Sequence, residues 1–362
     1  MEQKVMKALV YRGNTVPNLI ERPIPKLLED TDALVRVTLS TICTSDLHIL
    51  RGAVPRAKPE TILGHEFVGE IVETGSAVRH LYPGMRVAAN CITFCGECYF
   101  CKKGFINNCE KGGWELGCRI DGCQAEYVRV PYADMGLTPI PDGVTDENAL
   151  FVGDILSSGY FGAELCELKP GDTAAVIGCG PVGLCAMQCA RLFGAAKILA
   201  FDVDQSRLER ALSLGLAEDG CNPSLQDVQE FVCGHTGGRG VDGVIEAAGS
   251  PQSFTMSWQI ARPNAVVALV AMYEQPQVLP LPSMYGKNLI FKTGGVDAVH
   301  CETLLRLIQA GKLNTDFLIT HRAPLNEIIQ GYRVFENRLD GCIKWAVTPY
   351  EYGKEDADGK SV

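Results

Sequence analysis

The stretch at residues 173–202, which reads TAAVIGCGPVGLCAMQCARLFGAAKILAFD, decides the fold of the region around it. It opens with a short apolar run at 173–177 and passes through a glycine-rich turn into a helical segment of small and apolar residues at 184–193. It closes with a second apolar run at 197–201. A strand, a helix and a second strand in this order form a βαβ unit, whose two strands are parallel. We therefore predict a parallel sheet at this point of the chain.

The glycine-rich turn has the pattern G-x-G-x-x-G, and an acidic residue follows it about twenty residues later, at the end of the second strand. Glycines at these positions let the backbone approach a pyrophosphate, which rests on the N-terminus of the helix. A lone motif of this kind is weak evidence, but here strand, glycines, helix, strand and acid occur in the required order. The alternative is a glycine-rich structural turn. The residues expected to bind the dinucleotide are Gly178, Gly180, Pro181, Val182, Gly183, Asp202 and Arg207.

The acidic residue also bears on the kind of dinucleotide. A carboxylate at Asp202 would accept hydrogen bonds from the adenosine ribose hydroxyls and would repel a 2′-phosphate. The sequence therefore favours NAD over NADP. Arg207 is close enough in the chain to weaken that preference, because a guanidinium could accommodate the extra phosphate.

Further apolar runs alternate with helical segments beyond this unit, so we predict a doubly wound parallel sheet, a Rossmann domain, at residues 158–297. Residues 1–157 instead consist of short strands with Gly and Pro turns, which is typical of a compact, strand-rich, barrel-like domain. Residues 298–362 are expected to return to that first domain. The apolar runs of the second domain are 243–249, 265–270 and 289–295.

A cysteine-rich loop interrupts the first domain at about residues 91–112. Tetrahedral zinc needs four ligands about 2.3 Å away, and short C-x-x-C loops supply that geometry. Because the protein would fill all four positions, such a zinc is expected to be structural and not catalytic. Free cysteines, or a disulfide, are the alternative. The expected ligands are Cys95, Cys98, Cys101 and Cys109.

Composition narrows the class of protein. The 362 residues include 33 Lys and Arg against 43 Asp and Glu, a net charge of −10, with no basic block of the kind that binds nucleic acid. No secretory signal and no membrane-spanning run is visible. We therefore expect a cytoplasmic protein, in which the sixteen cysteines serve as metal ligands more often than as disulfides.

A second group of potential zinc ligands precedes the cysteine-rich loop. Cys43 lies in the run Cys43-Thr44-Ser45-Asp46-Leu47-His48, and His65 and Glu66 follow some twenty residues later. Cysteine, histidine and glutamate all bind zinc readily. Ser45 and His48 lie beside the cysteine and could carry a proton.

With these motifs in this order, the chain resembles the zinc-dependent medium-chain alcohol dehydrogenases over nearly its whole length. The resemblance implies a GroES-like catalytic domain joined to a Rossmann domain, an α/β architecture. It is similar to the bacterial secondary-alcohol branch, in which an aspartate replaces the third zinc ligand, a cysteine, of the animal and plant enzymes. The matching residues are Gly64, His65, Glu66, Gly69, Gly75 and Val78, the four-cysteine loop and the run that begins at Cys43.

The resemblance implies roles for individual residues. Cys43, His65 and Asp154 would hold a catalytic zinc, with Glu66 binding it in some states or acting as an acid beside it. The alternative for Asp154 is a helix N-cap. Zinc with one open position would bind the alcohol oxygen and lower its pKa, so that the alkoxide could pass a hydride to NAD. Ser45 would hydrogen-bond the alcohol, and His48 would pass the proton to solvent.

Other positions carry weaker expectations from the same resemblance. Thr44 and Lys344 match positions that contact the phosphates or ribose of the cofactor, although Lys344 could equally be an ordinary surface lysine. Trp114 matches a substrate-pocket tryptophan, with Leu47 and Ile155 as neighbours, although a core tryptophan is equally common.

Several activities share this pattern. The expected function is reversible, NAD-dependent interconversion of a small alcohol and its ketone or aldehyde, with two zinc ions per chain and a homotetramer or dimer as the assembly. A polyol or amino-alcohol (threonine-like) dehydrogenase of the same fold is the first alternative. A non-catalytic NAD-binding relative and a zinc-free quinone reductase are others, disfavoured because the zinc ligands are present.

Overall fold

The computed structural model describes residues 4–13 and 16–350. The chain divides into two compact units. One comprises Met1–Ser157 and Asp297–Val362, and the other comprises Ser158–Val296. The second boundary lies one residue before the expected one. No helix in the described part of the chain is long and apolar enough to cross a membrane.

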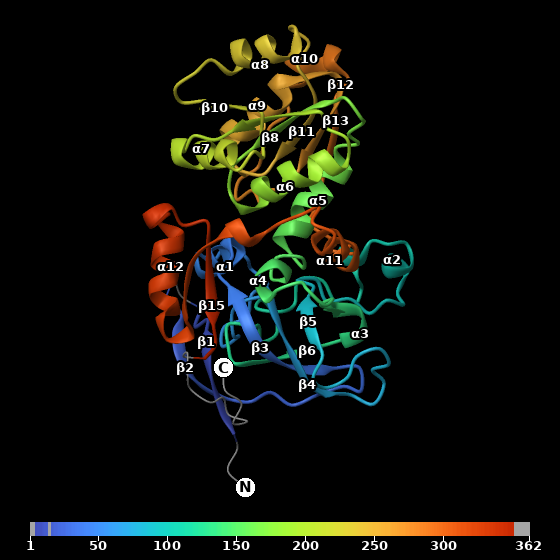
Figure 1. Ribbon diagram of the computed structural model, residues 1–362, viewed down its shortest axis with the longest axis vertical. Coiled ribbons are helices and arrows are strands. Elements are labelled where there is room, and N and C mark those ends of the chain that lie inside the picture. The colour runs from blue at the N-terminus through green and yellow to red at the C-terminus, as the bar shows by residue number, and fades with distance from the viewer. Residues whose placement is uncertain (1–3, 14–15, 351–362) are drawn as a thin grey trace. The chain divides into compact units, whose positions relative to one another are not determined.

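The unit at 158–296 is built on a six-stranded parallel sheet in the order β10-β9-β8-β11-β12-β13. Figure 1 shows helices α6 and α7 on one face of this sheet and α8 and α9 on the other, as right-handed crossovers require. The strands are β8 (Thr173–Ile177), β9 (Lys197–Phe201), β10 (Asp219–Cys221), β11 (Val241–Glu246), β12 (Ala261–Leu269) and β13 (Ile290–Thr293). The helices are α6 (Pro181–Leu192), α7 (Gln205–Ser213), α8 (Val228–Thr236), α9 (Pro251–Ile260) and α10 (Leu281–Met284).

The strand order reverses between β8 and β11, and the glycine-rich turn follows β8 at that point. Ligands of open α/β sheets bind where the order reverses, beyond the carboxyl ends of the strands. Strand β11 ends at Glu246, earlier than the expected 243–249 run, because its carboxylate accepts hydrogen bonds from the N–H groups of Ala248 and Gly249 and bends the chain into a turn.

The other unit is organised around a seven-stranded mixed sheet in the order β14-β15-β3-β4-β5-β7, with β6 also pairing with β3. Strands β1 (Val5–Val10) and β2 (Asn18–Pro23) form a separate antiparallel pair. The seven strands are β3 (Ala33–Thr41), β4 (Phe67–Thr74), β5 (Arg86–Ala89), β6 (Tyr127–Val130), β7 (Leu137–Pro139), β14 (Ile319–Pro324) and β15 (Lys344–Thr348).

The C-terminal segment completes this sheet. Strand β15 pairs antiparallel with β3, with Ala346 opposite Thr41 and Val347 opposite Ser40. Helix α12 packs on β15, and its inner face joins a buried apolar cluster with residues of α1. The helices of this unit are α1 (Thr44–Leu50), α2 (Tyr99–Lys102), α3 (Ala133–Gly136), α4 (Asp146–Ala149), α11 (Cys301–Gln309) and α12 (Ile328–Glu336), and α5 (Ile155–Leu165) runs across the boundary of the two units in the chain.

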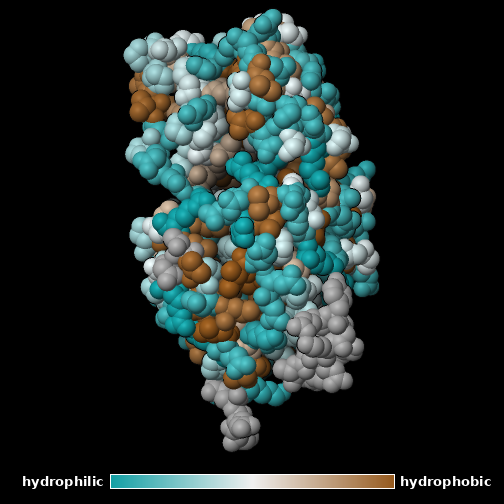
Figure 2. Space-filling model, turned by 90° about the vertical axis from the view of Figure 1, so that its left-hand side faces the viewer, coloured by the Kyte–Doolittle hydropathy of each residue, from teal (hydrophilic) through white to brown (hydrophobic). Residues whose placement is uncertain are grey.

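The surface shown in Figure 2 mixes hydrophilic and hydrophobic side chains. Scattered apolar side chains of this kind are ordinary on a folded protein and indicate no particular partner.

Candidate functional site

Four potential metal ligands from three separate segments meet in the mixed-sheet unit. One ligand atom from each of Cys43, His65, Glu66 and Asp154 lies within 4.8 Å of all the others. After the role predicted for them, we call these four residues the catalytic cluster. The structure thus brings together residues that lie as far as 111 positions apart in the chain.

Cys43, His65 and Glu66, the first three potential ligands, lie in two turns of the chain. Cys43 follows β3 and is the N-cap of α1, where its own N–H donates to the carboxylate of Asp46 at 2.9 Å. His65 and Glu66 directly precede β4, after Gly64, whose φ of +93° suits glycine. A Cβ at Gly64 would lie 2.6 Å from Cγ of Gln124, so a side chain there would collide with the neighbouring chain.

The loop before α5 delivers the fourth ligand, Asp154. A Cβ at the preceding Gly153 would lie 1.7 Å from the carbonyl oxygen of Ala89, so only glycine lets this loop lie against β5. The N–H of Cys91 donates to the Gly153 carbonyl at 3.0 Å and fixes that approach. The carboxylate of Asp154 therefore faces the cluster because the backbone before it is held close to the sheet.

The His65 ring is held from both sides. Its Nε2 lies 3.1 Å from Oδ2 of Asp154 and 3.1 Å from Oγ of Ser45, and its Nδ1 lies 3.5 Å from Oδ1 of Asp46. Burial disfavours the charged ring, but the bonds to Asp154 and Asp46 outweigh it and raise the pKa of His65 well above its usual value. Nε2 thus points into the cluster, while Nδ1 faces a carboxylate, the arrangement found around metal-binding histidines.

Burial shapes the charges of the other ligands. It is the largest influence on Cys43 and raises the pKa of its thiol, and it also raises the pKa of Glu66 against the opposing effect of Lys344. Burial acts in the same sense on Asp154, but there the bond with His65 prevails and lowers its pKa. The cluster thus gathers several acidic groups in a space screened from water, where a positive charge stabilises their ionised forms.

Lys344 supplies one positive charge beside these acidic groups. It is 1% exposed on β15, and its ammonium contacts Oε2 of Glu66 and donates to the carbonyl of Ile42 at 3.1 Å. Burial alone would lower the pKa of Lys344, but Glu66 and the other acidic groups nearby raise it, so the side chain is cationic. This buried ion pair was not expected from the sequence, where Lys344 is predicted to contact the cofactor, and that contact stays a prediction.

The donor set fits zinc. Thiolate, imidazole and carboxylate are its usual ligands, and Oε1 of Glu66 is buried without a hydrogen-bond partner. When zinc is bound, such a site supplies a Lewis acid to an alcohol or carbonyl oxygen. The remaining expected residues lie nearby on α1: Ser45 touches His65, and His48, one helical turn further on, is 9% exposed.

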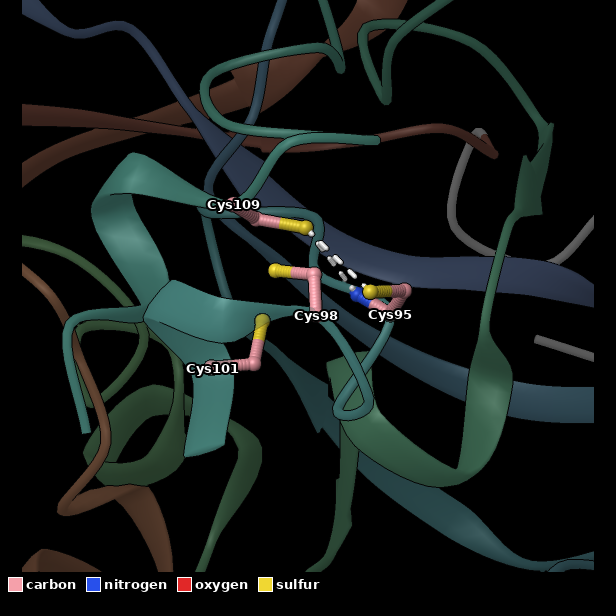
Figure 3. Close-up of side chains that lie close together, drawn as sticks. All are labelled: Cys95, Cys98, Cys101 and Cys109. Carbon is pink, nitrogen blue, oxygen red and sulfur yellow. Dashed lines mark hydrogen bonds between the residues drawn. The ribbon is translucent and has the colours of Figure 1, made fainter. Parts of the chain in front are cut away.

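The four cysteines of the second group also converge, as Figure 3 shows. Their sulfur atoms lie within 4.8 Å of one another, and those of Cys95 and Cys109 are 3.6 Å apart. Tetrahedral zinc with bonds of 2.3 Å would separate its sulfurs by about 3.8 Å, so the spacing fits. Backbone N–H groups lower the pKa of Cys98 to about 6, whereas burial raises that of Cys101 to about 12. We call this loop the cysteine lobe.

The glycine turn of the parallel-sheet unit has the shape that a dinucleotide needs. Gly178 has φ of +98°, and a Cβ at Gly183 would lie 1.7 Å from the Gly178 carbonyl oxygen, so both positions require glycine. Asp202 accepts hydrogen bonds from the N–H groups of Cys179 at 2.7 Å and Asp204 at 2.8 Å. Its carboxylate is therefore fixed beside the turn. Helix α6 starts directly after Gly180, with Pro181 and Val182 in its first turn.

The expected pocket residues occupy different surroundings. Trp114 is half-buried, with its ring edge-on to His65 at 5.6 Å and the guanidinium of Arg56 over it at 5.3 Å. Leu47 and Ile155 are buried, and Leu47 belongs to the apolar cluster beneath α1. Thr44 is exposed at the start of that helix. The structure thus sets Trp114 beside His65, a potential metal ligand, while the substrate contacts of all three pocket residues stay predictions.

Two family models match the chain: the alcohol dehydrogenase GroES-like domain over residues 29–142 and the zinc-binding dehydrogenase over residues 181–308. An alcohol dehydrogenase from Cupriavidus necator is 38% identical over 368 residues, covering 96% of this chain and 99% of the relative. The chain belongs to the zinc-dependent medium-chain alcohol dehydrogenase family.

Solved structures of other members agree with this membership. Alcohol dehydrogenase TADH from Thermus sp. ATN1 is 36% identical with a TM-score of 0.88, over 95% of this chain and 99% of that one. Zinc-dependent alcohol dehydrogenase 2 from Streptococcus pneumonia is 37% identical with a TM-score of 0.89, over 95% and 98%. The predicted fold class and family are confirmed, and membership of this alcohol dehydrogenase family implies zinc and NAD(P) as cofactors.

Sequence reasoning missed three residues that contact the catalytic cluster or its neighbours. Asp46 stands three positions after the N-cap Cys43, so a capping-box pattern could have revealed both it and the unpredicted helix α1. Gln124 and Tyr332 carry no local signal, since the bond of Gln124 to Asp46 and the bond of Tyr332 to Gln124 both depend on the tertiary fold.

Proposed function

We propose that this chain is a zinc-dependent alcohol dehydrogenase that interconverts small alcohols and their ketones or aldehydes with NAD(H). The observation that carries the proposal is the convergence of Cys43, His65, Glu66 and Asp154, with Ser45 beside the imidazole. Zinc supplies electrophilic activation of the oxygen, and the nicotinamide exchanges the hydride.

The protein's own groups supply orientation and proton movement. The hydroxyl of Ser45 is placed to bond the substrate oxygen and to take its proton. His48 lies on the same side of α1, three residues later, and is the acceptor from which that proton reaches solvent. Trp114 provides an apolar wall beside the metal ligands and so excludes water from one side of the reacting carbon.

The finer assignments of cofactor rest on the geometry of each site. We assign one zinc to the catalytic cluster and one to the cysteine lobe, because each set of donors lies within 4.8 Å and suits zinc. We assign NAD in preference to NADP because the carboxylate of Asp202 is fixed beside the glycine turn, where it repels a 2′-phosphate. The guanidinium of Arg207 lies close to Gly180, 3.5 Å from the position of a Cβ there, and is available to a phosphate of the dinucleotide.

We also assign a cytoplasmic location and an assembly of several copies, a homotetramer or a dimer. Thiol ligands need a reducing compartment, which favours the cytoplasm. Strand β13 ends the parallel sheet, and exposed apolar side chains accompany it, with Ile290 at 48%, Val278 at 78% and Tyr285 at 86% exposure. An edge of this kind favours pairing with a second copy. Light scattering of the purified protein measures the assembly, and a monomer at micromolar concentration would contradict it.

A metal count and a substrate panel test the function itself. We expect about two zinc ions per chain. We also expect reduction of NAD with some members of a panel of primary alcohols, secondary alcohols, polyols, amino alcohols and hydroxysteroids. Zinc in the cysteine lobe alone, with no turnover on any member, would refute the proposed activity. Turnover confined to amino alcohols or polyols would select the alternative substrate class.

A further inference from the structure

A chain of buried hydrogen bonds runs from helix α12 to the catalytic cluster. The hydroxyl of Tyr332 donates to Oε1 of Gln124 at 2.8 Å, and Nε2 of Gln124 donates to Oδ2 of Asp46 at 3.0 Å. Tyr332 is 5% exposed, and the other two residues are 0% exposed. None of these side chains is a metal ligand, and the proposed reaction does not use them directly.

Asp46 links this chain to two ligands of the catalytic cluster. Its Oδ2 accepts from the N–H of Cys43 at 2.9 Å as well as from Gln124, while its Oδ1 lies 3.5 Å from Nδ1 of His65. With both donors on Oδ2, Oδ1 is left to face the imidazole. The rotation of this one carboxylate therefore sets how Oδ1 stands against Nδ1, and a carboxylate in that place favours a proton on Nδ1 and one orientation of the ring.

Tyr332 in turn decides the orientation of the Gln124 amide. The amide oxygen accepts the hydrogen bond of the tyrosine hydroxyl, so the NH₂ group faces two acceptors. These are Oδ2 of Asp46 and the carbonyl of Thr41 at 3.4 Å. The reverse orientation would set an amide oxygen against a carboxylate and an NH₂ group against a hydroxyl. Because these groups are buried, a lost bond is not readily replaced by water, and the network depends on each member.

We propose that Gln124 and Tyr332 are positioning residues of the catalytic metal centre, which act by holding Asp46 against His65. The inference rests on the proposed function in one respect, that the catalytic cluster binds a metal. It assigns to a tyrosine on the C-terminal helix a part in metal affinity, although Tyr332 touches no ligand. Two bonds separate its hydroxyl from the carboxylate that contacts the imidazole.

The test compares metal binding at the two centres of the same chain. Tyr332→Phe removes the hydroxyl and keeps the ring in its apolar cluster, and Gln124→Met removes the amide at similar size. Partners of metal-binding histidines change metal affinity by about 10–100-fold when lost, so we expect a fall of roughly 3–30-fold at the catalytic cluster and none in the cysteine lobe. The measurement is Co²⁺ titration of the metal-depleted full-length chain, with Cys43→Ser identifying the absorption of the catalytic cluster.

Tyr11→Phe is the matched control, because Tyr11 is 8% exposed and belongs to the same apolar cluster as Tyr332. The proposal requires Tyr332→Phe to weaken and shift the Co²⁺ spectrum of the catalytic cluster while Tyr11→Phe leaves it unchanged. Equal effects of the two variants, or an equal loss of affinity at both metal centres, would overturn the positioning role. If the unaltered protein bound no metal at the catalytic cluster, the proposed function would fail first and this inference with it.

Discussion

The catalytic cluster and the cysteine lobe both gather four potential ligands within 4.8 Å, but they hold them by different means. In the lobe, a single loop supplies all four sulfurs, and backbone N–H groups point at them, as from Cys95 to Sγ of Cys109 at 3.3 Å. In the catalytic cluster, three separate segments supply the ligands, and buried side chains, Asp46 and Lys344, contact them.

This difference predicts that the cysteine lobe is a fixed structural site, whereas the coordination of the catalytic cluster can change. A zinc held by four thiolates would have no position for another molecule, so a metal in the lobe would only stabilise its loop. In the catalytic cluster, Oε2 of Glu66 contacts the ammonium of Lys344. Its other carboxylate oxygen, Oε1, is buried without a hydrogen-bond partner. With zinc bound, a set of this kind could change its coordination when a substrate oxygen binds, and the buried side chains of Asp46 and Lys344 add to the backbone contacts that position its residues.

The largest effect expected from this comparison is that of Cys43→Ser. Loss of the only thiolate in the cluster removes electrophilic activation worth several kcal/mol, so kcat should fall by at least ~10³-fold. Binding of NAD to the other unit should persist, and so should one zinc per chain. Steady-state kinetics, cofactor fluorescence and metal analysis measure the three quantities. The exposed Cys233→Ser is the control, and retained turnover in Cys43→Ser would contradict the zinc mechanism.

Lys344→Met tests the side-chain support of the cluster. Breaking a buried ion pair leaves the Glu66 carboxylate uncompensated, so we expect a loss of about 3–5 kcal/mol in the free energy of unfolding. Lys344→Arg keeps the charge and should recover part of that loss. Denaturant unfolding of both variants measures the difference. Stability equal to that of the unaltered protein in Lys344→Met would show that the pair does not matter to the fold.

Cys109→Ser should have a smaller effect, on stability and not on chemistry. With a thiolate missing, the lobe loses its zinc, and the melting temperature should fall by roughly 5–10 °C. At a temperature well below the transition, kcat should stay within about 3-fold of its original value, because the lobe touches no reacting group. A drop in kcat without a drop in melting temperature would mean that the lobe is not merely structural.

Asp202→Ala touches neither metal centre and gives the smallest effect. Removing the carboxylate should lower the preference for NAD over NADP by about tenfold, with little change in zinc content. The ratio of kcat/KM for the two cofactors measures it. Asp204→Ala is the matched control, since this nearby carboxylate caps α7 and binds the N–H of Ser206. An unchanged ratio in Asp202→Ala would remove the ribose role.

Sequence alone could predict the features that depend on residues close together in the chain. The strand at 197–201 agrees residue for residue with β9, and the four lobe cysteines are close enough in the chain to be recognised by spacing. Cys43, His65 and Asp154 could be grouped only through a family resemblance, because no local pattern links positions in three segments. The contacts of Gln124 with Asp46 and of Lys344 with Glu66 could not be predicted, since only the tertiary fold brings these distant segments together.

The pairing of β15 with β3 has a consequence for biosynthesis. The chain emerges from the ribosome with its N-terminus first, so all four catalytic ligands are made before the parallel-sheet unit, and Tyr332 and Lys344 only after it. A nascent chain therefore contains its four potential ligands early, but Asp46 and Gln124 gain the contact of Tyr332 only when α12 is made, and Glu66 gains the ammonium of Lys344 only with β15. A protein truncated before β15 would retain every metal ligand and still lack a finished active centre.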